Sequence, residues 1–434
     1  MPAYTGTVKI LFVSTLYVPN AVGGAEATVK LLAEGVVRNG GEAVVVTLSP
    51  DRSSAERIVE GVHVQGVPLF NVFFPHGAGR RPVWLKPLWH FVEACNPVMA
   101  RRLRRVIRRE APDVVNIHNL QGFSCAIWPM LAGLGIPTVQ TLHDHYTACV
   151  NSVMYRQGRN CSRRCLRCRM LCAPRRVLSR HVGVVTAVSR RLLSRIEGFG
   201  LFPYAIDKRV IHGCNTDVVL PLGRTLPAPG EPVRLGFLGR LEPIKGLELL
   251  LTAAERIGQQ HIRVCVGGVG PLAYEAALKS RFACAQIEFL GRVAPSDFFA
   301  GIDALVVPSI VEDALPRVIH EAMGFGVPVI GAAIGGIPEM IREGKTGFLF
   351  PAGDGTALEA TLRRIVETPP DWAALSAACR DESQRFTFAH VFAEYWAAWT
   401  AAAQGPPTRA PATAFSGRAA SPSDPLLGGR TGSP

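Results

Sequence analysis

Residues 308–330 read PSIVEDALPRVIHEAMGFGVPVI and place three acidic side chains around one predicted junction between a strand and a helix. The apolar stretch DALVVPS (303–309) is predicted to be a buried strand, and the loop after it holds Glu312 and Asp313. A helix is predicted to follow, with Glu321 in its second turn. Loops at the carboxyl ends of parallel strands form the ligand-binding edge of open α/β sheets. Asp313 and Glu321 are therefore expected to face a ligand, whereas Glu312 is expected to point away from it and to tolerate substitution by alanine.

Short apolar runs alternate with helical patterns on both sides of this segment. Almost continuous apolar character is typical of parallel strands that are covered on both faces. The predicted strands are 8–14, 42–49, 113–119, 138–144 and 183–189 in the first half, and 233–239, 261–268, 287–291, 303–309 and 327–332 in the second. Alternation of strands and helices on this scale predicts α/β domains with doubly wound parallel sheets.

The sequence predicts two domains of this kind, separated by the Pro- and Gly-rich segment PLGRTLPAPGEP (221–232). Two such domains are expected to face each other across a central cleft. The last helical pattern is expected to pack back toward the first domain, and the Pro-, Gly- and Ser-rich end of the chain is expected to be disordered. The predicted boundaries are 1–205 for the N-terminal domain, 206–385 for the C-terminal domain, 386–403 for the helix and 404–434 for the tail.

Length and composition predict a globular protein. The 434 residues are 48% apolar, which provides enough material for large cores. The chain starts with MPAYTGTVKILFVS, without a long apolar segment or a small-residue cleavage site. The uncharged stretch 119–142 contains Pro129, Gly133, Gly135 and Pro137, so it is interpreted as a helix and a strand and not as a membrane span. A cytoplasmic location is expected.

The net charge of +13 is concentrated in the first half of the chain. Residues 1–205 hold 26 Lys and Arg against 11 Asp and Glu, whereas the remainder holds 21 against 23. The run RRLRRVIRRE (101–110) is either a solvated helix face or a surface for an anionic membrane or an acidic acceptor. Nucleic acid is not expected as a partner, because no recognition motif or aromatic interleaving accompanies the charge.

Two cations in the second half are candidate diphosphate ligands. In FLGRLEPIKG, Arg240 follows a predicted strand and Lys245 precedes a predicted helix. A guanidinium can bind two phosphate oxygens, an ammonium acts as a point charge, and a helix N-terminus adds to both. The alternative is that both are ordinary surface cations. The Gly-rich turn GGVGPL (267–272) and the LGR at 290–292 are predicted to lie on the same rim.

Taken in order, six motifs resemble the retaining glycosyltransferases of family 4, which have the GT-B fold of two Rossmann-like domains. The motifs are GGAE (23–26), GRLEPIKG (239–246), GGVGP (267–271), residues 308–331, GGIPE (335–339) and GKTGFLF (344–350). The resemblance extends over roughly residues 8–400. It implies an acceptor-binding N-terminal domain and a C-terminal domain that binds a nucleotide sugar, with UDP or GDP as the expected nucleotide.

The resemblance also implies roles for single residues. Glu321 would hold the ribose, and Asp313 would take the place of a glutamate beside the donor sugar, with a shorter side chain than the family has. Arg240 and Lys245 would bind the diphosphate, and a glycine pair would approach it from the other domain. The implied donor-binding set is Gly23, Gly24, Arg240, Lys245, Gly268, Gly270, Arg292, Val293, Asp313, Ala314, Leu315, Pro316 and Glu321.

Histidines at the ends of two predicted strands are the candidates on the N-terminal side. His118 and His143 are interpreted either as core residues or as groups that face the cleft. The resemblance implies that His118 lies near the donor sugar. His143, Asp144 and His145 are expected to bind the acceptor.

The predicted mechanism is a front-face displacement with retention, in which Arg240 and Lys245 stabilise the leaving diphosphate. The predicted catalytic set is His118, Asp313, Arg240 and Lys245. Because the sequence has no Asp-x-Asp motif, no metal or other cofactor is expected to take part in catalysis.

Five of the eleven cysteines lie between residues 149 and 172, in a predicted insertion. Four of these, Cys161, Cys165, Cys168 and Cys172, have spacings of three, two and three residues. Such a set in a cytoplasmic protein predicts a structural zinc site more than disulfides. Reactive thiols and an insertion without a defined role are the alternatives.

The leading hypothesis is sugar transfer to a saccharide or a lipid-linked saccharide in the synthesis of a bacterial polysaccharide or glycolipid. A nucleotide-sugar 2-epimerase shares the fold, but it is expected to lack the combination of GRLEPIKG with two acids that have seven residues between them. A catalytically inactive nucleotide-binding interaction module is the third hypothesis, and nucleotide binding together with transfer distinguishes it from an enzyme.

Overall fold

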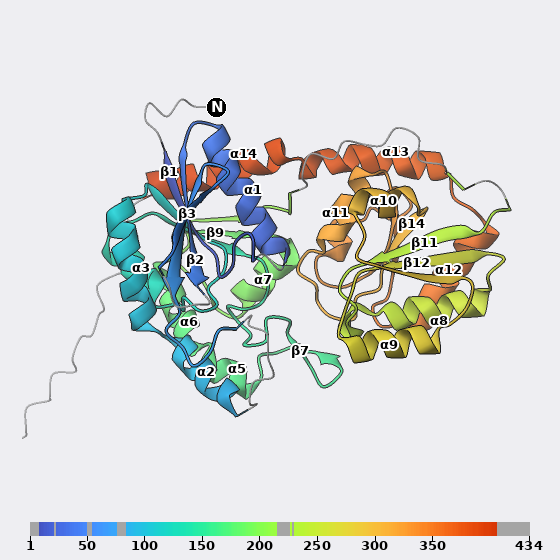
Figure 1. Cartoon of the computed structure of the whole chain (residues 1–434), viewed down its shortest axis with the longest axis horizontal. Helices are drawn as coiled ribbons and strands as arrows, with labels where there is room; N and C mark the ends of the chain where they lie inside the picture. Colours follow the sequence, from blue (N-terminus) through green and yellow to red (C-terminus); the bar gives the residue numbers. More distant parts are fainter. Residues whose placement is uncertain are drawn as a thin grey trace, which may run out of the picture.

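The computed structural model describes residues 8–20, 23–49, 54–75, 84–214, 226–227 and 230–405. The described residues form two parallel-sheet α/β domains that lie side by side (Figure 1). This arrangement confirms the predicted fold class. Most of the predicted linker 221–232, and residues 406–434 of the predicted tail, lie outside the described residues.

The N-terminal sheet has the strand order β10-β9-β6-β5-β1-β2-β4-β3. Its strands are β1 (Lys9–Val13), β2 (Glu42–Ser49), β3 (Glu56–Val59), β4 (Val62–Pro68), β5 (Val114–Ile117), β6 (Thr138–Leu142), β9 (Val184–Ala187) and β10 (Asp207–Val210). These strands pair in parallel except for the antiparallel β3–β4 hairpin at the edge. The surrounding helices are α1 (Gly24–Arg38), α2 (Leu85–Ala94), α3 (Pro97–Glu110), α4 (Ile127–Gly133), α5 (Leu166–Leu171), α6 (Ala173–Leu178) and α7 (Arg190–Gly198).

The C-terminal sheet is parallel throughout and has the order β13-β12-β11-β14-β15-β16. Its strands are β11 (Val233–Leu238), β12 (Ile262–Gly267), β13 (Ile287–Gly291), β14 (Ala304–Val307), β15 (Val329–Ala332) and β16 (Gly347–Phe350). Its helices are α8 (Leu247–Ile257), α9 (Leu272–Arg281), α10 (Pro295–Ala300), α11 (Arg317–Gly324), α12 (Gly355–Glu367) and α13 (Trp372–Ser383). Buried apolar side chains cover both faces of each sheet, as the continuous apolar runs predict.

Helix α14 (Phe388–Gln404) crosses back from the C-terminal domain and covers one face of the N-terminal sheet (Figure 1). Its buried side chains Phe392, Tyr395 and Trp399 pack in the same cluster as Ile10 and Phe12 of β1. The Trp399 Nε1–H donates a 2.9 Å hydrogen bond to Oδ1 of Asn116 on β5. The predicted helix 386–403 therefore corresponds to an element that completes the N-terminal core.

The structure places the boundary between the domains later than residue 205. Strand β10 pairs in parallel with β9, so residues 207–210 belong to the N-terminal sheet. The sequence DKRV carries three charged side chains and gives no apolar signal, which is why a short edge strand there was not predicted.

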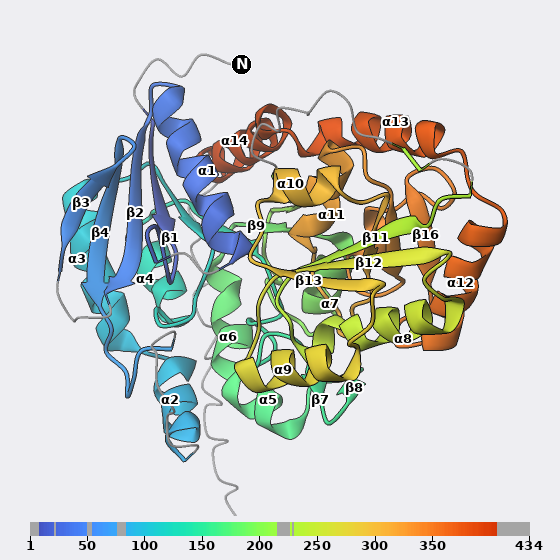
Figure 2. The ribbon, with the colours of Figure 1, turned by 45° about the vertical axis from the view of Figure 1, so that its right-hand side comes forward.

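The cysteine-rich insertion contains a two-stranded hairpin, β7 (Tyr155–Arg156) and β8 (Arg159–Asn160), followed by α5. In Figure 1 helix α5 lies below the N-terminal sheet, beside α2, and in Figure 2 the hairpin lies near α9 of the C-terminal domain. Among the described residues, no helix is long and apolar enough to cross a membrane.

Candidate functional site

A cleft of about 1370 Å³, partly open to solvent, is lined by residues of both domains. Nine residues of the predicted donor or acceptor sets line it, and they come from loops far apart in the sequence. They are Gly23, Gly24, His143, Asp144, Arg240, Lys245, Asp313, Leu315 and Pro316. The predicted convergence of the strand-end loops is thus present for these residues, and the cleft lies at the carboxyl ends of the strands.

The N-terminal wall of the cleft includes the first turn of α1. The backbone N–H of Gly23 donates a 2.9 Å hydrogen bond to Oε2 of the buried Glu26, which closes a capping box at the start of this helix. A Cβ on Gly24 would lie 2.6 Å from Cδ of Arg317 in the opposite domain. Glycine at position 24 therefore lets the two walls approach closely, and the first helical turn presents backbone N–H groups to the cleft.

The C-terminal wall carries its charges in pairs. Arg240 follows β11 and lies 2.9 Å from Glu242, with a side chain that is 67% exposed. Lys245 ends a 3₁₀ turn (Pro243–Lys245) just before α8 and forms an ion pair with Asp313. The predicted phosphate ligand and the predicted sugar-facing acid are therefore in direct contact, an arrangement that spacing alone did not predict.

The loop that holds Asp313 is packed tightly against its neighbours. The Ile310 N–H donates to the Ile244 carbonyl at 3.0 Å, and a Cβ on Gly246 would lie 1.9 Å from the Pro308 carbonyl oxygen. Gly246 also has a φ of +73°, which favours glycine. These contacts fix the distance between Lys245 and Asp313.

The remaining predicted donor residues of the rim do not line the cleft within the described chain. A Cβ on Gly268 would lie 1.8 Å from the Gly239 carbonyl oxygen, so this glycine is required for packing between two rim loops. Gly270 has the same role against Leu241. Arg292 is exposed and Val293 is half-buried beside Gly267, while Ala314 is 8% exposed. A direct donor contact by these five residues stays a prediction.

Glu321 lies on α11, as predicted, and its carboxylate is 3.0 Å from the Arg317 guanidinium. Arg317 lines the cleft and was not predicted as a site residue. The i, i+4 spacing of arginine and glutamate was the signal that could have identified it. The role of Glu321 toward a ribose is untested and stays a prediction.

The two histidines form one buried pair, but only His143 lines the cleft among the described residues. Nδ1 of His118 is 2.9 Å from Nε2 of His143, and His118 is 2% exposed, with its ring stacked on Tyr395. The structure therefore differs from the expectation that His118 itself faces the cleft. Ile117 of β5 is paired with Gln140 of β6, so the chain after β6 reaches further toward the cleft and places His143 in front of His118. Burial lowers the pKa of His143 to about 4 and holds the pKa of His118 well below its usual range, so both rings are neutral near pH 7.

Asp144 lines the cleft, whereas His145 does not. Burial raises the pKa of Asp144 to about 6, although a 2.7 Å hydrogen bond from the Tyr146 N–H opposes the shift. His145 is 2% exposed, and its Nε2 lies 3.9 Å from Glu312 of the other domain. The expectation that His145 binds the acceptor is wrong in this structure, because the turn after β6 directs its ring into the interface between the domains.

Glu312 was expected to tolerate alanine, yet its side chain forms ion pairs and its backbone N–H donates a hydrogen bond to Asn160. It points away from the cleft, as predicted, but it is 7% exposed and pairs with two arginines of α7. The spacing of residues within 308–330 could not predict these partners, since they lie more than a hundred residues away.

The cysteine cluster gathers around Cys149 and Cys168, whose sulfur atoms are 3.9 Å apart. Cys172 is buried in the same small core, and Cys161 and Cys165 pack against it. Among the described residues, no group of three or more His, Cys, Asp or Glu side chains is placed to hold a metal ion. The predicted four-thiol set is therefore not assembled here. The zinc site stays a prediction, for which elemental analysis of protein purified without added metal is the measurement.

Comparison with known proteins adds family evidence to this geometry. Residues 22–213 match the family model described as Glycosyltransferase Family 4, and residues 232–368 match the one described as Glycosyl transferases group 1. The chain belongs to the family 4 glycosyltransferases. The predicted recognition is thereby confirmed.

Relatives and solved structures agree with this membership. An uncharacterised 42.6 kDa protein in the cps region of Klebsiella pneumoniae is 26% identical over 77% of this chain and 87% of its own length. A putative colanic acid biosynthesis glycosyltransferase, WcaL of Salmonella typhimurium, is 28% identical over 43% of this chain and 48% of its own. The crystal structure of Anabaena HepE in complex with UDP has a TM-score of 0.66 at 18% identity, over 91% of this chain and all of that one. This family 4 member therefore has the GT-B fold.

Proposed function

We propose that this glycosyltransferase moves a sugar from a nucleoside diphosphate sugar to a saccharide or lipid-linked acceptor, with retention of anomeric configuration. The observation that carries the proposal is the group of cations at the start of α8, where Arg240 and Lys245 line the cleft beside Asp313. Cations at a helix N-terminus suit a diphosphate. The UDP in the similar HepE structure supports a UDP-linked donor, and GDP is the alternative.

The walls of the cleft suit a displacement in which the diphosphate leaves toward the C-terminal domain. Lys245 and Arg240 stabilise the negative charge that develops on the leaving oxygen. Asp313, beside Lys245, faces the positive charge that develops on the sugar as the glycosidic bond breaks. The neutral imidazole of His143 accepts or donates a hydrogen bond without adding charge near that carbon. In this front-face reaction the leaving phosphate oxygen takes the acceptor proton.

A panel of nucleotide sugars tests this proposal against its two alternatives. Purified full-length protein is expected to hydrolyse one donor slowly and to be stabilised by the matching nucleoside diphosphate. Release of a 2-epimer without hydrolysis would indicate the epimerase. Nucleotide binding without hydrolysis or transfer for any donor and acceptor in the panel would favour the inactive module.

A surface of α2, α5 and α6 supports a lipid-linked acceptor. Here α2 contacts α5, and both lie at the lower end of the N-terminal domain (Figures 1 and 2). This apolar surface consists of the exposed side chains Trp84, Leu88, Phe91, Leu166, Met170 and Val177. Exposed cations accompany it at Lys86, Arg167, Arg169 and Arg176.

The charge around this apolar surface favours an anionic lipid bilayer as its partner. No acidic residue occurs between Asp144 and Glu197, and Glu93 of α2 is fully buried. Exposed tryptophan, phenylalanine and leucine among arginines are typical of segments that lie in a membrane interface. We infer that the enzyme works at the cytoplasmic face of a membrane, where a lipid-linked saccharide would be presented.

Vesicle sedimentation tests this contact. Phe91→Glu is expected to lower binding to vesicles with 30% phosphatidylglycerol by about tenfold, because it removes apolar contact and adds repulsion. Ile58→Glu, a change at a 75% exposed apolar residue on β3, is the matched control that should bind normally. Equal binding of the wild-type chain to neutral and anionic vesicles would contradict the inference.

A further inference from the structure

Helix α7 of the N-terminal domain is the point at which two acids of the C-terminal domain dock. Glu339, in the GGIPE motif, accepts hydrogen bonds of 2.7 Å from the backbone N–H groups of Arg190 and Arg191 at the start of this helix. Glu312, in the loop after β14, binds the side chains further along it. Carboxylates at a helix N-terminus are stabilised by the helix dipole, so α7 is suited to receive them.

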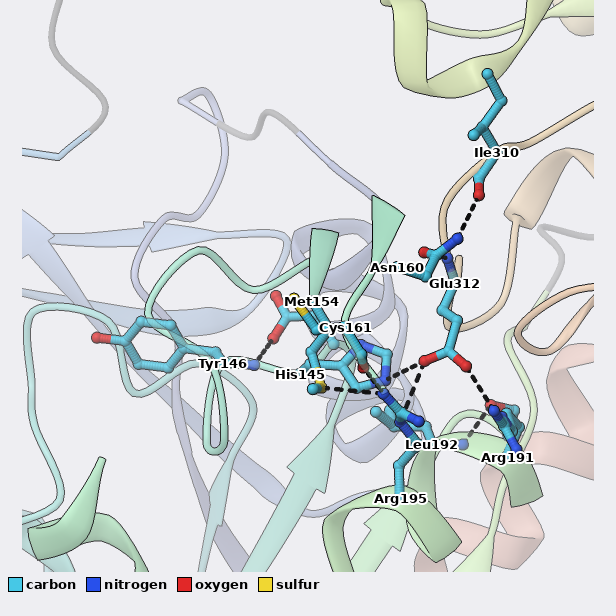
Figure 3. Close-up of polar contacts among 12 residues, drawn as sticks. His145, Tyr146, Met154, Asn160, Cys161, Arg191, Leu192, Arg195, Ile310 and Glu312 are labelled. Carbon is cyan, nitrogen blue, oxygen red and sulfur yellow. Dashed lines mark hydrogen bonds and ion pairs between the residues drawn. The ribbon is translucent and has the colours of Figure 1, made fainter. Parts of the chain in front are cut away.

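Glu312 is held more closely than an ordinary surface acid. Its Oε1 is 2.6 Å from Nη2 of Arg191, and its Oε2 is 3.2 Å from Nε of Arg195. The carboxylate is 7% exposed, and the Arg195 side chain is 15% exposed. Figure 3 shows the Glu312 carboxylate between these two arginines, and the His145 ring lies next to Arg195. An ion pair of this kind depends on its geometry, because both charges have lost most of their water.

The cysteine-rich insertion holds the same loop by its backbone. The Asn160 side chain donates to the Ile310 carbonyl at 2.8 Å and accepts from the Glu312 N–H at 3.2 Å. Arg195 joins the two attachments, since its guanidinium also donates to the Cys161 carbonyl (Figure 3). The loop that carries Asp313 is therefore attached to the N-terminal domain on both sides of position 311.

The other side of the loop is fixed within its own domain. The Gly336 N–H donates to the Asp313 carbonyl at 2.8 Å, and a Cβ on Gly335 would lie 2.1 Å from that oxygen. Glu339, three residues after Gly336, is the acid that docks on the start of α7. Contact between the domains thus reaches Asp313 from two directions, through Glu312 and through the GGIPE motif.

We propose that Glu312 is a positioning residue, which sets the Asp313 loop by its contact with Arg191 and Arg195 when the two domains face each other. This inference rests on the proposed function, because the group that it positions is the acid beside the transferred sugar. The Cys-rich insertion supports the catalytic loop through Asn160. It follows that approach of the N-terminal domain and correct placement of Asp313 are coupled events.

The test uses the full-length chain with Glu312→Gln, which keeps the shape and the backbone contact to Asn160 and removes the charge. Amide hydrogen exchange of residues 308–316 is expected to accelerate about fivefold, since the loop loses one attachment. UDP affinity is expected to stay within about twofold and kcat to fall about tenfold, because misplacement affects the transition state. The matched control is Glu197→Gln, a change on the same helix α7 that removes an exposed ion pair with Lys208 of β10. Its amide exchange, UDP affinity and kcat are expected to equal those of the wild type.

A second comparison separates positioning from loss of folding. In the Asp313→Asn background, Glu312→Gln is expected to lower kcat by less than about twofold, because the group on which it acts is already altered. Arg195→Met should reproduce the effect of Glu312→Gln from the other side. Unchanged exchange, an unchanged kcat, or a full tenfold loss in the Asp313→Asn background would overturn the proposal. If the wild-type chain transfers no sugar, the proposed function fails, and the exchange data still decide whether Glu312 positions the loop.

Discussion

The two walls of the cleft differ in the kind of polar group that they present. On the C-terminal wall, Arg240 and Lys245 remain charged and lie against Glu242 and Asp313. On the N-terminal wall, burial holds His143 neutral and raises the pKa of Asp144 to about 6. A charged leaving group needs fixed counter-charges, whereas an uncharged hydroxyl nucleophile needs hydrogen-bonding groups such as the neutral His143 ring and a carboxylate of raised basicity such as Asp144. The difference indicates which wall holds the diphosphate and which one receives the acceptor.

The largest expected effect comes from removing the central cation of the charged wall. Lys245→Ala is expected to lower kcat/KM by about 100-fold or more, because one stabilising group for the leaving diphosphate is lost and Asp313 is left without its partner. Steady-state kinetics with one donor measure it. His143→Gln on the neutral wall is the comparison, and its UDP affinity should equal that of the wild type. A loss of UDP affinity in His143→Gln would contradict the division between the walls.

A smaller effect is expected for Glu321, which lies on the charged wall but away from the breaking bond. Glu321→Ala is expected to raise the donor KM about tenfold with little change in kcat, as for a residue that binds ground state and transition state equally. The same assay on Glu343→Ala, an acid that lies 3.8 Å from Arg364 outside the cleft, serves as control. A fall in kcat without a change in KM would show that Glu321 acts on the sugar and not on the ribose.

The smallest effect concerns stability on the neutral wall. The raised pKa of Asp144 means that the folded state binds this proton more tightly than the unfolded state, so stability is lost as the pH rises from about 4 through about 6. Asp144→Asn removes this loss, and its Tm relative to the wild type is expected to rise by a few degrees between pH 4 and pH 7. Calorimetry at several pH values measures it. A difference in Tm that does not change with pH would show that folding does not raise the pKa of Asp144.

The sequence predicted the features that depend on local pattern. Ten of the parallel strands, Lys245 before α8, Asp313 after β14 and Glu321 on α11 were predicted, because strand ends and helix starts in a doubly wound sheet meet at one edge. Strands β3, β4, β10 and β16 were not predicted. Strands β3 and β10 are short and carry few apolar side chains, and β16 has only four residues.

Contacts between the domains could not be predicted in the same way. Arg191 and Arg195 occur in a sequence half with 26 basic residues, so nothing distinguishes them from surface charge. Their partner, Glu312, is 121 residues from Arg191. Hydrophobic periodicity predicts local helices and strands, and it does not predict contacts between residues that far apart. Which of the two histidines lines the cleft depends on the register between β5 and β6. The spacing of residues in the sequence does not determine that register.

The return of α14 has a consequence for how the protein is made. Ile10 and Phe12 belong to β1, but Phe392, Tyr395 and Trp399, which cover them, are synthesised much later than that strand. Until then α1 alone covers part of that face of the N-terminal sheet, and the part under α14 stays open. Domains otherwise tend to fold as units in order of synthesis. The N-terminal half therefore has to wait for the C-terminal half, and an isolated fragment ending at residue 214 would expose a large apolar face to aggregation.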